Sequence, residues 1–232
     1  MIFKIESQMQ FPMATISMQH GEGCRISSGS MVYHSDGVTL QAHLNGKGGG
    51  IGKFVGALAR SAVSGESVFI TEVSCNAASG DVAIAPSIPG SITSLDVGTR
   101  QYCLNDYTFL AMESTVNYSM KRQNIGKAIF SRSGGLFVMH TEGQGKMLIN
   151  SFGSIKEIML DNVRNFAVDN GHVVAWDSTL NYEIKLQSGF FGSIGTGEGL
   201  INVFNGTGRL LIQSLNLDAF GGVLTPYLKI SR

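Results

Sequence analysis

An internal repeat is the sequence feature that most constrains how this chain folds. The segment FLAMESTVNYSMK at residues 109–121 is matched by VVAWDSTLNYEIK at residues 173–185, with identical Ala, Ser, Thr, Asn, Tyr and Lys positions and an offset of 64. The segment MVYHSDGVTLQAH at residues 31–43 takes the same place 78 positions before the first of these. A chain that repeats itself at this spacing folds as a series of similar supersecondary units.

We predict three such units within a single domain that spans residues 1–232. The aligned segments place their limits at about residues 15–97, 98–161 and 162–230. We expect the three units to superpose. Their common register predicts inward-facing side chains at one equivalent position, which is occupied by Val38, Val116 and Leu180.

Each unit carries the two-residue periodicity of half-buried antiparallel strands. Apolar and polar residues alternate in GVTLQAHL, TVNYSMK and TLNYEIK, and turn signals such as SDG, DNG and NGTG separate the runs. Hydrophobic residues make up 43% of the chain, and 30 glycines stand against 4 prolines, which fits tight turns between covered strands. The sequence therefore predicts an all-β fold, an antiparallel β-sandwich built from three internal repeats.

A glycine-rich loop in the first unit has the form of a phosphate-binding turn. It reads GKGGGIG at residues 46–52 and precedes a helical pattern at residues 53–63. Glycines in such a turn let backbone N–H groups approach a pyrophosphate. However, both other units also have glycine-rich connections in this slot, and the chain lacks the alternating strands and helices of a dinucleotide fold. We therefore predict that this loop binds no dinucleotide, and we expect no cofactor.

The charge balance and the cysteines limit which partners and which cellular compartment are expected. Basic and acidic residues both number 17, so the overall charge favours neither a nucleic-acid nor a membrane partner. The three cysteines, Cys24, Cys75 and Cys103, form no C-x-x-C pair and fit buried thiols in a reducing compartment. The N-terminal segment MIFKIESQMQ has polar residues where a signal peptide would be apolar, so we expect a cytoplasmic protein.

Several segments, spread in order over nearly the whole chain, resemble one protein family. They include SGSMVYHSDGVTL, VAIAPSIPGSI, INSFGSIKEIML, VDNGHVVAWD and GTGEGLINVFNGTGRLLIQS. They are similar to the altered-inheritance-of-mitochondria-24 family, a group long labelled a domain of unknown function, and here to a prokaryotic member. The resemblance implies a fold of the tryptophan RNA-binding attenuation protein type, which is related to double-stranded β-helix sandwiches. It implies a link to membrane organisation in the mitochondrial members, but it implies no reaction and supplies no catalytic residue to carry over.

Histidine and aspartate suggest one site for metal or acid–base chemistry. His172 stands between Asp169 and Asp177 in the segment VDNGHVVAWD. Thr108 occupies the position of His172 in the middle unit, so this slot accepts a residue without a metal-binding group. We therefore expect a turn there, with no metal site and no catalytic residue. The other histidines lack ligand-spaced companions; they are His20, His34, His43 and His140.

Basic residues gather in two corresponding connections that contain no Asp or Glu, residues 44–65 and 114–141. Within residues 53–63, apolar residues fall on one helical face and basic residues on the other, which predicts one short amphipathic helix inserted in the first repeat. It would either cap a sheet, with the basic residues simply solvated, or contribute to a surface for an anionic partner. The candidate residues of that surface are Lys47, Lys53, Arg60, Lys121, Arg122, Lys127 and Arg132.

Three hypotheses of function follow. The first is a non-enzymatic assembly or partner-binding protein that forms a homo-oligomer, because sheets built of repeats present edge strands that need covering. Its further partner would be anionic, a membrane surface more than nucleic acid. The alternatives are a small-molecule-binding or cupin-like enzyme that uses the β-structure interior, and an RNA-binding protein by analogy of fold.

Overall fold

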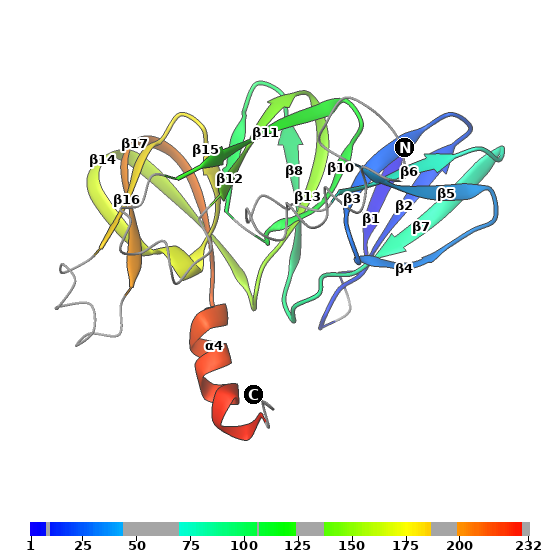
Figure 1. Cartoon of the computed structure of the whole chain (residues 1–232). Helices are drawn as coiled ribbons and strands as arrows, with labels where there is room; N and C mark the ends of the chain where they lie inside the picture. Colours follow the sequence, from blue (N-terminus) through cyan, green and yellow to red (C-terminus); the bar gives the residue numbers. More distant parts are fainter. Residues whose placement is uncertain (8–9, 44–69, 106, 124–136, 187–198, 229–232) are drawn as a thin grey trace.

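The computed structural model describes residues 1–7, 10–43, 70–105, 107–123, 137–186 and 199–228. These residues form antiparallel β-strands almost throughout, arranged in three sheets, with a short helix near the C-terminal end. Figure 1 shows the strands as a row of three groups, with the N-terminal strands at one end and the C-terminal strands at the other. The predicted all-β, antiparallel, sandwich-like fold is therefore confirmed.

Four strands make the first sheet. In spatial order they are β1 (Ile2–Ile5), β2 (Ala14–Gln19), β7 (Ser79–Ile84) and β4 (Met31–His34). Six strands make the second sheet, in the order β5 (Val38–His43), β6 (Ile70–Cys75), β3 (Gly23–Ser27), β10 (Phe109–Glu113), β13 (Gly145–Asn150) and β8 (Ile92–Val97).

The third sheet has six strands in one path and a seventh beside it. The path is β11 (Val116–Arg122), β12 (Phe137–Gly143), β9 (Tyr102–Leu104), β15 (Val173–Asp177), β17 (Leu200–Gln213) and β14 (Ile155–Asp169), and β16 (Asn181–Leu186) pairs with β17. Burial follows the alternation of the sequence. In β2, for example, Ala14, Ile16 and Met18 are buried and the residues between them are partly exposed.

The same strand pairing occurs three times along the chain. The triplets β2-β7-β4 and β8-β13-β10 each have one central strand, and β17 has the corresponding place between β14 and β15. The outer strand of each triplet also has its bulge at the corresponding site, between Met31 and Tyr33, between Phe109 and Ala111, and between Val173 and Ala175. These shared pairings match the strands of one group with those of the others, so that β4, β10 and β15 correspond to one another.

Two junctions hold the three groups of strands together. β3 pairs with β10, and β9 pairs with β15, so the second and third sheets each extend from one group into the next. Side chains cross these junctions as well. Leu110 of β10 packs into the first core with Ile16 and Val82, and Val174 of β15 packs into the second core with Leu104. The first and second cores are therefore each completed by a strand from the following group.

The equivalent position that the repeat predicts to face inward is buried in all three groups of strands. Val38, Val116 and Leu180 have their side chains in the first, second and third core respectively. β14 runs without a break across the predicted boundary between residues 161 and 162. That the three segments superpose as repeats stays a prediction.

The helical content differs from the sequence-based expectation. The glycine loop at 46–52 and the helix predicted at 53–63 lie outside the described residues. The described α-helix is α4 (Leu217–Leu224), in a segment where we expected none, so that expectation is wrong. Asn216 starts α4 by accepting hydrogen bonds from the backbone N–H groups of Asp218 and Ala219, while Gly221 and Gly222 lower its intrinsic helix propensity and obscure its pattern.

Candidate interaction surface

The edge strand β4 presents four exposed side chains in succession, three of them large and apolar. Val32 is 49% exposed and Tyr33 is 52% exposed, and Met31 is also exposed. β4 pairs with β7 on one side, and no strand in the described part of the chain pairs with its other side. An exposed apolar edge with free backbone N–H and C=O groups is a ready site for strand addition.

The strands that correspond to β4 are buried. Val32 corresponds through the shared bulge to Leu110 in β10 and to Val174 in β15, which are 1% and 0% exposed. Tyr33 likewise corresponds to Ala111 and Ala175, which are both fully buried. β10 and β15 are buried because each is covered by the preceding group of strands. β4 has no preceding group in the described chain, so its apolar side chains stay exposed.

The second half of β14 lies at the opposite end of the row (Figure 1) and has a matching open edge. Phe166, Ala167 and Val168 pair with β17 on one side only. Ala167 is exposed, and Phe166 and Val168 are partly buried against the third core. Val168 corresponds to Ile26 in β3 and to Leu104 in β9. Both of these residues are fully buried under a neighbouring strand.

The C-terminal helix α4 adds a second exposed apolar feature, below the place where the middle and C-terminal groups of strands meet (Figure 1). Figure 1 shows it leading away from the sheets. Phe220 packs edge-on against Phe152 with the ring centroids 5.2 Å apart, yet it is still partly exposed. The other exposed apolar residues of α4 are Leu217, Val223 and Leu224. Asp218 is the charged residue of α4.

A cysteine and a histidine lie together inside the third sheet. Cys103 Sγ is 3.3 Å from His140 Nδ1, and the two residues are opposite each other on β9 and β12. This is the geometry of a nucleophile and its base. Burial, however, raises the pKa of the Cys103 thiol to about 12, against a partial opposing effect of Lys121. Burial also lowers the pKa of His140, and Lys121 lowers it further. Both groups are therefore neutral at pH 7, and the thiol is not activated.

We expect Cys103 to resist alkylation in the folded protein. Its pKa rises from an ordinary value of 9.0 to about 12, which reduces the thiolate fraction at pH 8 by about 1000-fold relative to the unfolded chain. The stabilisation linked to this raised pKa is complete below pH 9 and is lost as the pH rises toward 12. Iodoacetamide labelling with peptide mapping, in buffer and in urea, measures the difference. Equal labelling rates in both would contradict it and favour a reactive thiol.

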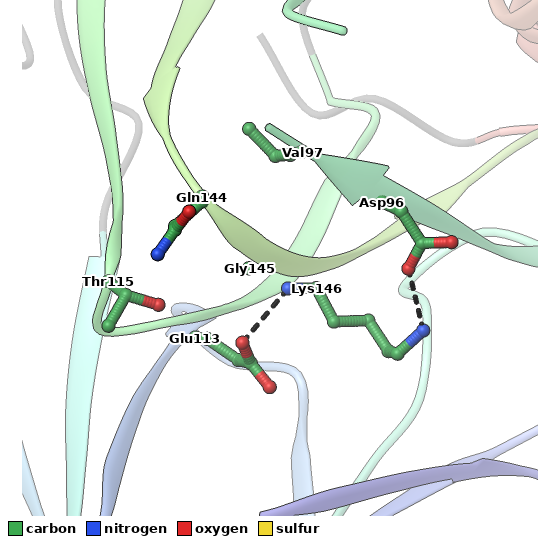
Figure 2. A pocket seen from close by; sticks show the side chains of 7 residues that line it. All are labelled: Asp96, Val97, Glu113, Thr115, Gln144, Gly145 and Lys146. Carbon is green, nitrogen blue, oxygen red and sulfur yellow. Dashed lines mark hydrogen bonds and ion pairs between the residues drawn. The ribbon is translucent and has the colours of Figure 1, made fainter. Parts of the chain in front are cut away.

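A shallow depression lies beside β8 and β13, and Figure 2 shows the seven residues that line it. Its volume is about 480 Å³. Its charged groups already have partners: Lys146 Nζ lies 2.8 Å from Asp96 Oδ1, and Glu113 Oε2 accepts a hydrogen bond from the backbone N–H of Lys146. The Lys146 ammonium lowers the pKa of the Asp96 carboxyl. The depression is therefore lined by an ion pair and by a carboxylate that binds the backbone.

Asp169, His172 and Asp177, the residues considered for metal or acid–base chemistry, bind separate backbone groups. Asp169 accepts a hydrogen bond from the N–H of Gly171, and His172 Nδ1 donates to the carbonyl oxygen of Gln213. Asp177 accepts from the N–H of Arg209. Asp169 caps the short 3-10 helix η1 (Asn170–His172), which is a turn, and Asp177 lies at the other end of β15. Among the residues that the structure describes, no group of three or more His, Cys, Asp or Glu could hold a metal ion.

His20 and His34 contact separate backbone groups. His20 Nδ1 donates to the carbonyl oxygen of Asn76, and His34 Nδ1 lies 2.9 Å from the carbonyl oxygen of Ser35. For His43 the structure describes the backbone, which pairs with Ile70.

The predicted anionic-partner surface falls almost entirely outside the described residues. Lys121 is described, exposed on β11, and for Arg122 only the backbone is described. The clustering of these basic residues therefore stays a prediction. The others lie outside; they are Lys47, Lys53, Arg60, Lys127 and Arg132. Over the described ranges, no helix has both the length and the apolar character that a bilayer crossing requires.

Comparison with known proteins places this architecture in a family. An uncharacterized protein of Streptococcus pyogenes serotype M6 is 54% identical over 231 residues, which cover 100% of this chain and 92% of that protein. The crystal structure of a Streptococcus pyogenes protein is 52% identical, with a TM-score of 0.84 over 98% of this chain and 99% of that chain. The model of the Mitochondrial biogenesis AIM24 family matches residues 3–215. The resemblance found in the sequence segments is thus confirmed, and the chain belongs to the Mitochondrial biogenesis AIM24 family.

Proposed function

We propose that the protein works without catalysis, as an assembly protein that binds protein surfaces, including copies of itself, through its open strand edges. The observation that carries this proposal is the exposure of β4. Its counterparts β10 and β15 are each buried under another group of strands, whereas Val32 and Tyr33 are about half exposed. Soluble proteins usually protect such an edge with charges, proline or a covering segment. β4 has no charged residue or proline and consists of Met31, Val32, Tyr33 and His34.

The interior of the described chain supports binding more than catalysis. The three cores consist of packed apolar side chains, and the described depression is shallow, with its lysine and aspartate paired to each other. The Cys103 and His140 pair is neutral at pH 7. In a cupin-like enzyme, several polar side chains would instead point into one internal cavity.

A lipid surface is a second proposed partner, and α4 favours it. A short helix with exposed Leu217, Phe220, Val223 and Leu224 can bury its apolar side in a membrane interface. The predicted basic residues would add attraction to anionic lipids.

Light scattering and sedimentation velocity of two matched variants test the assembly function. Val32→Asp places a charge on the β4 edge, and Val223→Asp places the same charge on α4, where the side chain is also exposed. We expect the wild-type mass to rise above the 24.8 kDa of one chain with concentration. Val32→Asp should weaken this association about tenfold or more, because a carboxylate must then be desolvated in the interface.

Val223→Asp should leave self-association unchanged and reduce binding to anionic lipid vesicles if α4 contacts lipid. A wild type that stays monomeric up to high micromolar concentration would overturn self-assembly. Equal self-association of the wild type and the Val32→Asp variant would show that β4 does not form the contact.

A further inference from the structure

We propose that the protein assembles head to tail, with β4 of one copy pairing antiparallel with the second half of β14 in the next copy. This inference rests on the proposed assembly function and names the partner of the β4 edge, which is a second copy of this chain. The two internal junctions of the structure are its templates, because each already joins a β4-like strand to a β14-like edge.

The two internal junctions have the same register. In the first, Ile26 pairs with Ala111 and Arg25 pairs with Met112. In the second, Leu104 pairs with Ala175, and Cys103 pairs with Trp176. Ala175 and Trp176 lie 64 positions after Ala111 and Met112, which is the offset of the repeated segments. A single mode of strand addition therefore occurs twice within one chain.

β14 supplies the strand edge for a third junction of this kind. β3, β9 and the second half of β14 each pair antiparallel with a corresponding strand, which is β6, β12 and the first half of β17 respectively. Following these pairings, Val168 takes the place of Ile26 and Leu104, and Ala167 takes the place of Arg25 and Cys103. In the first two places the edge is covered by another strand, and at β14 it is open.

β4 supplies the strand that fits this edge. The shared bulge places Tyr33 where Ala111 and Ala175 lie, and His34 where Met112 and Trp176 lie. The third junction therefore pairs Tyr33 with Val168 of the next copy and His34 with Ala167. The larger Tyr33 faces a residue smaller than the Ile26 and Leu104 of the internal junctions.

Core packing also leaves a place for β4. The first core receives Leu110 from the next group of strands, and the second core receives Val174. The third core ends at Phe166 and Val168, which are only partly buried. Val32 corresponds to Leu110 and Val174 and is about half exposed. Its insertion beside Phe166 and Val168 would bury apolar surface on both copies.

The occupant is a second copy because the two edges lie at opposite ends of the same chain. Figure 1 shows β4 at the N-terminal end of the row and β14 at the C-terminal end. A contact between unlike surfaces is heterologous, so each copy keeps one open edge for the next. Repetition gives a ring where the rotation closes and a filament where it does not.

Disulfide cross-linking between two single-cysteine additions tests the register. His34→Cys and Ala167→Cys replace exposed residues that the proposal places opposite each other, where Cβ atoms lie about 4.5–5.5 Å apart. The three natural cysteines are buried and free, so oxidation of the wild type measures the background cross-linking that they cause. Ala42→Cys is the matched control, since Ala42 is an exposed alanine on the edge strand β5.

The two variants are mixed, oxidised and separated without reductant. We expect a dimer-size product in the mixture of His34→Cys and Ala167→Cys, with a yield about tenfold or more above the mixture of His34→Cys and Ala42→Cys. Mass spectrometry of the linked peptides should join the β4 cysteine of one copy to the β14 cysteine of the other.

Four results would overturn the head-to-tail contact. Self-association of the wild type without this cross-link would leave the assembly function standing and refute the pairing. Efficient linkage of His34→Cys with itself would show symmetric pairing of two β4 strands. A doubly substituted chain that forms a monomer-size cross-link would show closure within one chain. A monomeric wild type with no cross-link would refute both this contact and the proposed self-assembly.

Discussion

Replacing Trp176 by alanine is expected to lower the free energy of unfolding by about 3–5 kcal/mol. Trp176 is 1% exposed in the third core, with its ring centroid 4.7 Å from that of Tyr182 and 5.5 Å from that of Phe204. The substitution removes both ring contacts and leaves a cavity that the surrounding sheet can fill only partly. Trp176 also lies opposite Cys103 in the junction of β9 and β15, so the loss should weaken the joint between the last two groups of strands.

Urea denaturation followed by circular dichroism measures this loss, since the chain has a single tryptophan and its fluorescence disappears with the substitution. Tyr227→Ala is the control, because Tyr227 is 82% exposed and its loss should change stability by no more than about 0.5 kcal/mol. A similar small effect for Trp176→Ala would mean that the third core is not packed as described.

Replacing Gly90 by alanine is expected to destabilise the protein by about 3 kcal/mol or more. Gly90 forms a parallel bridge with Gly153 where the connection between β7 and β8 crosses the connection between β13 and β14. An added Cβ would overlap the carbonyl oxygen of Ser151 and lie 2.8 Å from the backbone nitrogen of Gly153. Both neighbours are backbone atoms, so relief requires the two connections to separate.

Gly98→Ala is the matched control for this prediction. A Cβ at Gly98 would have Gln144 Cβ at 3.9 Å as its neighbour, which is an ordinary contact. We expect its stability to match the wild type within about 0.5 kcal/mol. Thermal unfolding of the two variants side by side gives the comparison, and equal melting temperatures would show that the crossing at Gly90 is loosely packed.

Much of the fold could be predicted because its signals are local. The alternation in TVNYSMK and TLNYEIK places β11 and β16, since successive side chains of a strand point to opposite faces. The match of Val38, Val116 and Leu180 predicted three buried positions, and all three are buried. Helix α4 was missed because two adjacent glycines disturb its pattern, although Asn216 and Asp218 give a capping signal.

The candidate surface could be predicted only in general terms. Edge strands were expected from the repeats, but MVYHSDGVTL does not show that β4 is open while FLAMESTV is covered. Both segments have the apolar character of a strand. The Cys103 and His140 contact joins residues 37 positions apart in sequence, and no spacing motif marks it.

The sequence by itself determined the all-β class, the family, the repeated segments and the residues that face the cores, because these depend on neighbours in the chain and on side-chain periodicity. Only the tertiary structure decided which strand edges are covered. β10 and β15 are buried because a preceding group of strands pairs with each, and β4 is exposed because no described strand does. Edge pairing is a contact between distant segments, and equally apolar strands become core or surface according to whether such a partner lies beside them.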